Sequence, residues 1–366
     1  MKGQGRNLLA IAAFAAALVV PANAHADWQI KGRGFGHGVG MSQYGALGFA
    51  QEGRSYEQIL RHYYKGVIVG RADEKNVRVL IATGLGSVGV SGATKACGRN
   101  LKSGESYSFR LDSGDVTLRA GNDSRLASCG REATARGGGS VTFSGVGTYR
   151  GELRARNVGG ALYAINKVAL EDYVKGVVSN ESSPSWPQAA LRSQAVAARS
   201  NALVTRVDGD GYNLYDDSRS QVYGGSSSET PSTNEATTKT AGEVIKSDGQ
   251  TASAFFFSTS GGQTENSEFG FSGGSPRPYL KAVRDPFDDI SPYHRWSLRY
   301  SQGAMESRLS GLFQGNLKKV RILKTGVSPR IVKARVQGSS GSSTVSGATL
   351  RYRLGLRSTW ATFKKR

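Results

Sequence analysis

The sequence predicts an α+β fold: a strand-rich body that carries an inserted pair of helices, with two lobes around a cleft. Three observations lead to this prediction. Short runs of alternating apolar and polar residues, separated by Gly, Asn and Asp, dominate residues 77–165, as expected for strands in hairpins. Apolar residues at helical spacing fill residues 167–205. Strand-like runs return from about residue 318.

Residues 1–26 are predicted to be a signal peptide. Lys2 and Arg6 precede the apolar run LLAIAAFAAALVV, and the small-residue segment PANAHA follows it. This order is typical of a secretion signal with its cleavage site, which we place after Ala26, with Ala24 as the alternative. The run is short for a membrane span. We therefore expect a protein that is secreted to the cell wall or beyond.

The glycine-rich segment GRGFGHGVGMSQYGA at 32–46 surrounds His37 with six glycines. Two interpretations stay open: either His37 works in a site, or the glycines only allow a tight backbone path. Helical spacing over residues 56–64, with Ser55 as the N-cap, then predicts a helix. The alternating runs at 77–165 follow it as strands.

Two helices are predicted within residues 167–205. The first buries one apolar face, made of Val168, Tyr173, Val174, Val177 and Val178. The segment SSPSWP then interrupts the pattern. The alanine-rich run QAALRSQAVAARSNALVTR predicts the second helix, with Ser185 as its N-cap and Pro187 in its first turn.

The remaining chain is predicted to form a polar loop at 224–234, a short helix in NEATTKTAGE, a hairpin turned at Asp248-Gly249 and strands from residue 318. The chain then divides into a signal peptide at 1–26, a strand-rich region with the glycine-rich segment at 27–150, a core at 151–290, and a C-terminal strand-rich region at 291–366.

The formal net charge is +20, of which Lys2 and Arg6 contribute two. Exported proteins rarely meet nucleic acid, so we expect no nucleic-acid partner. Bacterial wall polymers and anionic membrane surfaces are the candidate partners. We interpret the basic residues as scattered along the chain, which favours diffuse retention on an anionic matrix. A merely solubilising surface is the alternative.

The two cysteines, Cys97 and Cys129, predict a disulfide in an exported protein. A metal site is the alternative, but it needs two further ligands, and His37, His62 and His294 lie far away in sequence. We therefore expect neither a metal nor a cofactor.

Glu181 lies where the first predicted helix ends and the proline-broken turn begins. A carboxyl held between two packed helices is partly removed from water, which raises its pKa and suits a general acid at neutral pH. A capping or solvated glutamate is the alternative.

The segment LEDYVKGVVSNESSPSWPQAALRSQAVAARSNAL resembles the signature of the stage II sporulation protein D (SpoIID/LytB) family, which includes proteins described as amidase enhancers. The segments YDDSRSQVYGG, FFFSTSGGQTE and GHGVGMSQYGA resemble three further family motifs, and LGLRSTW resembles the tail of actinobacterial members. One departure is that the glycine–histidine motif comes first here, whereas it usually closes the prototype domain. A role in sporulation, and the zinc of some relatives, are not carried over.

The resemblance implies an exported lytic transglycosylase, which cuts peptidoglycan between N-acetylmuramic acid and N-acetylglucosamine and leaves 1,6-anhydro ends, preferably on denuded strands. It implies that Glu181 is the single catalytic carboxyl. It further implies substrate-binding or supporting roles for His37, Ser42, Gln43, Gln194, Arg199, Gln221, Tyr223, Ser258, Ser260 and Gly261.

Glycan strands are then the substrate, and a cell-wall amidase is a further candidate partner. The main alternative is a non-catalytic wall-binding protein that stimulates an N-acetylmuramoyl-L-alanine amidase. A true amidase or peptidase would need a metal or a nucleophile that the sequence does not assemble.

Overall fold

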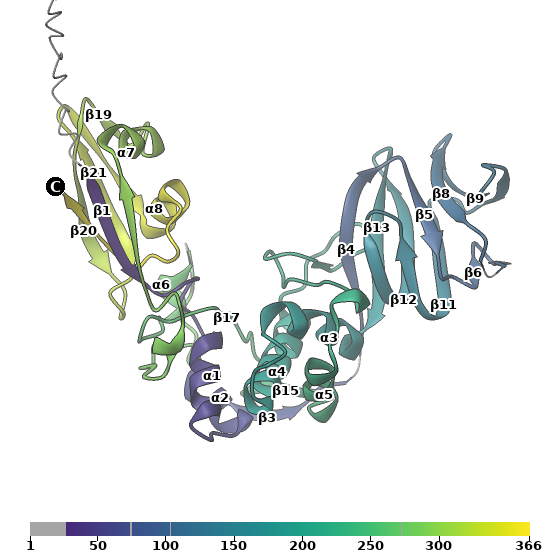
Figure 1. Ribbon diagram of the computed structural model, residues 1–366, viewed down its shortest axis with the longest axis horizontal. Coiled ribbons are helices and arrows are strands. Elements are labelled where there is room, and N and C mark those ends of the chain that lie inside the picture. Colours follow the sequence, from purple (N-terminus) through teal and green to yellow (C-terminus); the bar gives the residue numbers. More distant parts are fainter. Residues whose placement is uncertain (1–26, 74, 103, 272) are drawn as a thin grey trace, which may run out of the picture.

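The computed structural model describes residues 27–73, 75–102, 104–271 and 273–366. The predicted signal peptide lies outside the described residues. The fold is α+β and rich in strands, as the sequence predicts. Figure 1 shows a curved molecule with a group of strands at each end and helices at the bend. The buried apolar residues of the described chain gather in three clusters.

The largest sheet has eleven strands, and its alternating residues confirm the strands predicted at 77–165. Its main path runs β10-β9-β8-β5-β11-β12-β13-β4-β14, and β6 and β7 join it at β11. In β12, for example, Leu153 and Ala155 are fully buried while the arginines between and after them face outward. The strands are β4 (Asn76–Leu85), β5 (Ser87–Ser91), β6 (Lys95–Ala96), β7 (Arg99–Asn100), β8 (Tyr107–Asp112), β9 (Asp115–Ala120), β10 (Arg125–Ser128), β11 (Glu132–Phe143), β12 (Gly147–Val158), β13 (Ala161–Ala169) and β14 (Leu214–Tyr215).

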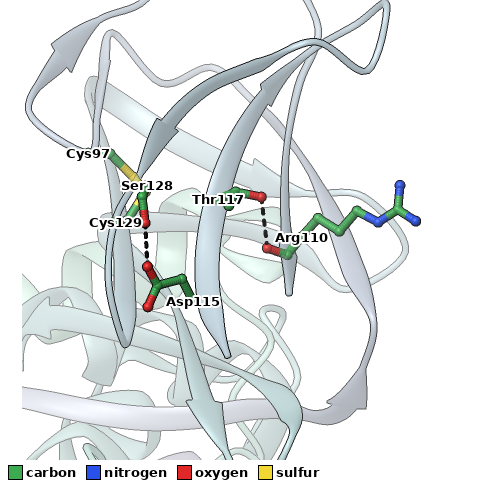
Figure 2. The surroundings of a disulfide bond; sticks show 6 residues. All are labelled: Cys97, Arg110, Asp115, Thr117, Ser128 and Cys129. Carbon is green, nitrogen blue, oxygen red and sulfur yellow. Dashed lines mark hydrogen bonds between the residues drawn. A yellow bond between two sulfur atoms is a disulfide. The ribbon is translucent and has the colours of Figure 1, made fainter. Parts of the chain in front are cut away.

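A disulfide between Cys97 and Cys129 closes one corner of this sheet (Figure 2). Cys97 lies in the turn between β6 and β7, and Cys129 directly follows β10, with 5.5 Å between their Cα atoms. Beside it, the Ser128 hydroxyl donates to Asp115 at 2.6 Å. The bond and this contact anchor β10, which is the last strand of the main path and has a neighbour on one side only.

The predicted helical pair is present as α3 (Leu170–Glu181) and α4 (Gln188–Val204). α3 packs Tyr173, Val174 and Val177 into the cluster of the large sheet. α4 is buried on two sides: Leu191 and Ala195 join the same cluster, whereas Val196 and Ala197 belong to the central one. Its small residues allow this double contact, and α4 thereby connects the two clusters.

Two details of the predicted pair are wrong. Val168 belongs to β13, because the strand passes into α3 without a linker. Ser185 does not cap α4; Pro187 occupies the N-cap position without a side-chain hydrogen bond, since its extended backbone places the helix start at Gln188. The loop predicted at 224–234 is also shorter than expected, because Thr230 caps α5 (Pro231–Lys239).

The central cluster joins segments from both halves of the chain. The predicted helix with the Ser55 cap is α2 (Tyr56–Tyr63), and Gln58 completes a capping box there. The hairpin turned at Asp248-Gly249 is also confirmed. The other elements here are β2 (Met41–Ser42), α1 (Gln43–Gln51), β3 (Ile68–Arg71), β15 (Glu243–Ser247), β16 (Gln250–Thr251), β17 (Phe256–Phe257), α6 (Ser267–Gly270) and the 3-10 turn η2 (Asp288–Ile290). A second 3-10 turn, η1 (Ser226–Ser228), contacts α3 and β12 instead.

Helix α1 was not predicted, because Gly45 and Gly48 lower its helix propensity. Both glycines are needed for close packing: a Cβ at Gly45 would overlap the Tyr63 hydroxyl, and one at Gly48 the Phe287 carbonyl. The Ser42 hydroxyl starts the helix by accepting from the Gly45 N–H at 3.2 Å.

The C-terminal module is the part with the third cluster, and its middle strand comes from the N-terminal end of the described chain. β1 (Trp28–Arg33) lies between β18 (Arg295–Tyr300) and β23 (Ala361–Lys365), antiparallel to both. In Figure 1 the purple strand β1 lies among the green and yellow strands of this module. A second sheet packs nearby, in the order β19-β22-β21-β20. The other elements are α7 (Gln302–Arg308), β19 (Phe313–Gln314), β20 (Leu317–Thr325), β21 (Ile331–Gly338), β22 (Gly341–Ser346) and α8 (Gly347–Leu354).

Candidate active site

Glu181 is the last residue of α3, and both of its carboxylate oxygens are hydrogen-bonded. Gln43 Nε2 donates to Oε2 at 3.0 Å, and the backbone N–H of Val222 donates to Oε1 at 3.3 Å. Burial raises the pKa of Glu181 above its usual value, and the two hydrogen bonds act in the opposite direction. The carboxyl is thus partly removed from water while two donors stabilise its charged form.

Gln43 brings the glycine-rich segment to the helical pair. It is the first residue of α1, its side chain is buried, and its Nε2 also lies 3.5 Å from Gln194 Oε1 on α4. Gln194 is itself buried, and its Nε2 has no partner among the described residues. The structure therefore brings Gln43, Glu181 and Gln194 together from three helices.

The glycines of this segment allow a close backbone path. Gly34, Gly36, Gly38 and Gly40 all have positive φ. A Cβ at Gly40 would overlap the Phe255 carbonyl oxygen, and one at Gly38 would lie 2.5 Å from Arg330 Nε. The segment runs beside residues 255–260 through the parallel β2–β17 pair, and in Figure 1 α1 lies near β17.

His37 uses both ring nitrogens on backbone groups. Its Nδ1 accepts from the Val39 N–H at 3.1 Å, so its Nε2 carries the proton and donates to the Phe256 carbonyl at 3.0 Å. Burial lowers the pKa of His37 to about 4, so the ring is neutral at neutral pH. In this state the ring fastens the glycine-rich segment to β17, and it also lines the pocket beside Glu181.

Two pockets of about 490 and 390 Å³ meet at Glu181, Gln43 and Ser258, which line both. The phenylalanine pocket, the larger one, is walled by His37, Asn201, Gln221, Phe255–Phe257 and Phe271, among others. The tryptophan pocket, the smaller one, is walled by Tyr44, Trp186 and Tyr293, among others. A chain-like ligand that fills both pockets would pass Glu181 on its way.

The other residues implied by the resemblance divide into two groups. Ser258 and Gln221 line pockets, although Gln221 Nε2 is engaged with the Ala198 carbonyl at 3.2 Å. The remaining ones are buried and hold the surrounding structure: Ser42, Arg199, Tyr223, Ser260 and the backbone of Gly261.

Arg199 illustrates the second group. Its guanidinium binds the Glu171 carboxylate through two hydrogen bonds of 2.7 Å, and its side chain is fully buried. Tyr223 likewise donates to Asn166 at 2.7 Å inside the large-sheet cluster. Neither side chain lines the pockets at Glu181.

Several further residues of the site were not singled out from the sequence. The Val222 donor is a backbone N–H, so its side chain does not reveal it. Tyr44 and Trp186 are aromatic residues within motifs, and their rings meet edge to face at 5.3 Å.

Asp285 is a second buried carboxyl in this part of the molecule, and it accepts from the Tyr63 hydroxyl at 2.9 Å. Burial, together with the negative charge of Asp288, raises the pKa of Asp285 to about 7.

Comparisons with known proteins agree with this arrangement. The family model described as stage II sporulation protein (SpoIID) matches residues 158–246, which include α3, α4 and Glu181. This part of the chain belongs to the SpoIID family. Stage II sporulation protein D of Bacillus subtilis (strain 168) is 32% identical over 217 residues, 53% of this chain and 60% of that protein.

Two further SpoIID relatives extend the comparison. Stage II sporulation protein D of Bacillus amyloliquefaciens is 28% identical over 213 residues, 54% of this chain and 60% of that protein. The amidase enhancer of B. subtilis is 36% identical over 135 residues, 37% of this chain and 18% of that protein. The chain thus spans at most 60% of the length of these relatives.

Within the described residues, no helix is long and apolar enough to cross a membrane. In the same part of the chain, no three His, Cys, Asp or Glu side chains are grouped so that they could hold a metal ion.

Proposed function

We propose that this SpoIID protein is an exported lytic transglycosylase that cleaves peptidoglycan between N-acetylmuramic acid and N-acetylglucosamine, preferentially on strands without stem peptides. The proposal rests on the surroundings of the Glu181 carboxyl. Among the described residues that line the two pockets, Glu181 carries the only carboxyl group, and burial raises its pKa.

A single carboxyl suffices because the nucleophile belongs to the substrate. Protonated Glu181 donates its proton to the glycosidic oxygen while the C1–O bond breaks. The carboxylate then accepts the proton of the muramic acid 6-hydroxyl, whose oxygen bonds to C1 and closes the 1,6-anhydro ring. No water is consumed, and Glu181 is protonated again. A two-carboxylate glycosidase would need a second carboxyl about 5–10 Å away.

The contacts of Glu181 support both proton transfers. Burial favours the acid form that the first step uses. The donors Gln43 Nε2 and Val222 N–H stabilise the carboxylate that the first step creates. The two influences oppose each other, and burial is the larger one, so the pKa of Glu181 is raised on balance.

The walls of the two pockets suit sugars on both sides of the bond that is cut. Rings of Phe255–Phe257 on one side, and of Tyr44 and Trp186 on the other, offer apolar faces beside a few polar groups. His37 contributes by position: its neutral ring holds the backbone that leads to Gln43, and it takes no part in proton transfer.

The test is product analysis on denuded glycan strands. The mature parent protein should release fragments with 1,6-anhydro ends, identified by mass. Glu181→Gln keeps the shape of the side chain but removes the transferable proton, so the rate should fall by at least about 10²–10⁴-fold. Glu235→Gln, an exposed glutamate on α5, is the matched control and should keep the parent rate. A folded Glu181→Gln protein that still forms anhydro ends at the parent rate would remove Glu181 as the acid.

The second candidate is a wall-binding protein that stimulates an amidase. Similarity to a protein named amidase enhancer favours it, as does the high net charge. In that case the parent protein would leave denuded strands intact, yet would increase the release of stem peptides by an added amidase.

A further inference from the structure

The basic residues occur throughout the chain, as expected, but the net positive charge is concentrated in the C-terminal module, where acidic residues are scarce. Residues 291–366 hold 16 lysines and arginines against one acidic side chain, Glu306, which accounts for +15 of the net charge of +20. The three strands β1, β18 and β23 contain no Asp or Glu. Charge of this density on one module attracts polyanions.

A groove of about 600 Å³ lies on the three-stranded sheet of this module, and we call it the basic groove. Residues of β1, β18 and β23 line it together with Trp360, which directly precedes β23: Lys31, Gly32, Arg33, Arg295, Trp296, Ser297, Trp360 and Thr362. Three of these side chains are cationic and none is acidic. It shares no lining residue with the two pockets at Glu181.

The cations of the basic groove face each other without anionic partners. Arg33 and Arg295 are directly opposite in the β1–β18 register, where two like charges are unfavourable. Burial and the charge of Arg295 both lower the pKa of Arg33. Among the described residues, neither arginine forms an ion pair within 4 Å, and the same holds for Lys31. A bound anion between them would relieve this repulsion.

Trp360 adds an aromatic wall beside the two arginines. Its carbonyl accepts from the Arg33 N–H at 3.0 Å, and its ring centroid lies 5.3 Å from the Arg33 guanidinium carbon. The ring is partly exposed in the groove. A guanidinium binds a carboxylate through two parallel hydrogen bonds, and the indole offers a flat apolar face to a ring-shaped neighbour.

We propose that the basic groove is a second glycan-binding site, separate from the pockets at Glu181, and that it binds a pyranose polymer with carboxylate groups. The two arginines bind the carboxylate, and Trp360 contacts the sugar ring. A denuded peptidoglycan strand has this chemistry, since each muramic acid carries a lactyl carboxylate; this choice of strand rests on the proposed function. Poly(glycerol phosphate) is a polyanion of higher charge density, but it has no pyranose ring in its backbone.

The test measures binding to immobilised denuded strands by interferometry at constant salt, with all variants made in a Glu181→Gln background so that the strands stay intact. Arg295 is exposed, so Arg295→Gln should fold normally and weaken binding about tenfold through the lost charge-assisted contact. Arg321→Gln is the matched control. Arg321 is also exposed and faces Arg335 across β20 and β21 in the same way, but it does not line the basic groove. It should change binding less than about twofold.

Competition identifies the ligand. Soluble denuded strands should displace the protein, whereas chitin oligosaccharides, which lack carboxylates, and poly(glycerol phosphate), which lacks pyranose rings, should displace it far less. Equal losses in Arg295→Gln and Arg321→Gln, or displacement by poly(glycerol phosphate) as strong as by the strands, would overturn the proposal in favour of general charge attraction. Specific binding by a parent protein that makes no anhydro ends would support the basic groove and refute the proposed function.

Discussion

Replacing Gln43 by methionine should move the pH profile of glycan cleavage to higher pH. Gln43 Nε2 is the side-chain donor to Glu181, at 3.0 Å. Methionine keeps the length of this buried side chain but cannot donate. Without the donor, the carboxylate of Glu181 loses a stabilising contact, and its pKa, which burial already raises, should rise further.

The structure sets the size of this shift. A hydrogen bond to a charged group contributes about 1.5–3 kcal/mol. The Val222 N–H remains bonded to the other oxygen of Glu181, and the carboxyl still borders two open pockets, so part of the loss is compensated. A net loss of about 1.4 kcal/mol corresponds to about one pKa unit. Because the acid form starts the reaction, the alkaline limb of the rate should move upward by about one pH unit.

The assay counts anhydro ends by mass at a series of pH values, at saturating substrate, so that the profile reports the enzyme–substrate complex. Ser258→Ala is the control, because Ser258 lines the same two pockets but forms its hydrogen bond with Thr259 and not with the Glu181 carboxyl. The alkaline limb of the rate profile of Ser258→Ala should lie at the same pH as that of the parent. A limb that stays in place in Gln43→Met, or that moves to lower pH, would refute the assigned role of Gln43 and the titration of Glu181 as the source of the profile.

Three further predictions concern stability. Cys97 and Cys129 should react with an alkylating reagent only after reduction, as measured by mass; two thiols that react without reductant would exclude the disulfide. Replacing both by serine should lower the free energy of unfolding by roughly 3–4 kcal/mol, given their separation of 32 residues. Gly40→Ala should lower the unfolding temperature far more than Gly53→Ala. Both glycines have φ of 76°, but only at Gly40 would the new Cβ overlap backbone atoms. Equal decreases in unfolding temperature would show that close packing of the glycine-rich segment is unimportant. Burial raises the pKa of Asp285 to about 7, so the folded state binds the proton of this carboxyl more tightly than the unfolded chain does. The resulting stabilisation of the folded state is complete below about pH 4 and is lost as the pH rises through 7. Asp285→Asn should remove that part of the pH dependence, and an unchanged slope of the unfolding temperature between about pH 5 and pH 8 would contradict it.

The elements with strong periodicity could be predicted from the sequence, whereas their junctions could not. Alternation identified the strand-rich region at 77–165, and apolar spacing identified α2, α3 and α4. The two-residue strand β14 of the same sheet lies outside the predicted region. Val168 was misplaced because β13 passes directly into α3, so that its apolar side chain fits either pattern. α1 escaped detection because Gly45 and Gly48 serve tertiary packing at the expense of helix propensity.

The candidate site was predictable to the extent that motifs mark it. The position of Glu181 at a helix end beside a proline-broken turn indicated a partly buried carboxyl, and the raised pKa agrees with this expectation. Arg199 belongs to the same signature, yet it is fully buried against Glu171, because a motif records structural and ligand-contacting residues alike. The Val222 N–H could not be predicted, since any residue could supply it.

The path of the N-terminal segment explains why the glycine–histidine motif can come first in this chain. β1 supplies Lys31 and Arg33 to the basic groove as the middle strand of a sheet whose other strands are C-terminal. The glycine-rich segment then runs along residues 255–260, and Gln43 reaches Glu181 ten residues after Arg33. One short segment therefore links the basic groove to the candidate acid. His37 and the close glycine contacts fasten this segment to β17, so the groove proposed for a glycan strand and the donor to Glu181 lie on one continuous stretch of chain.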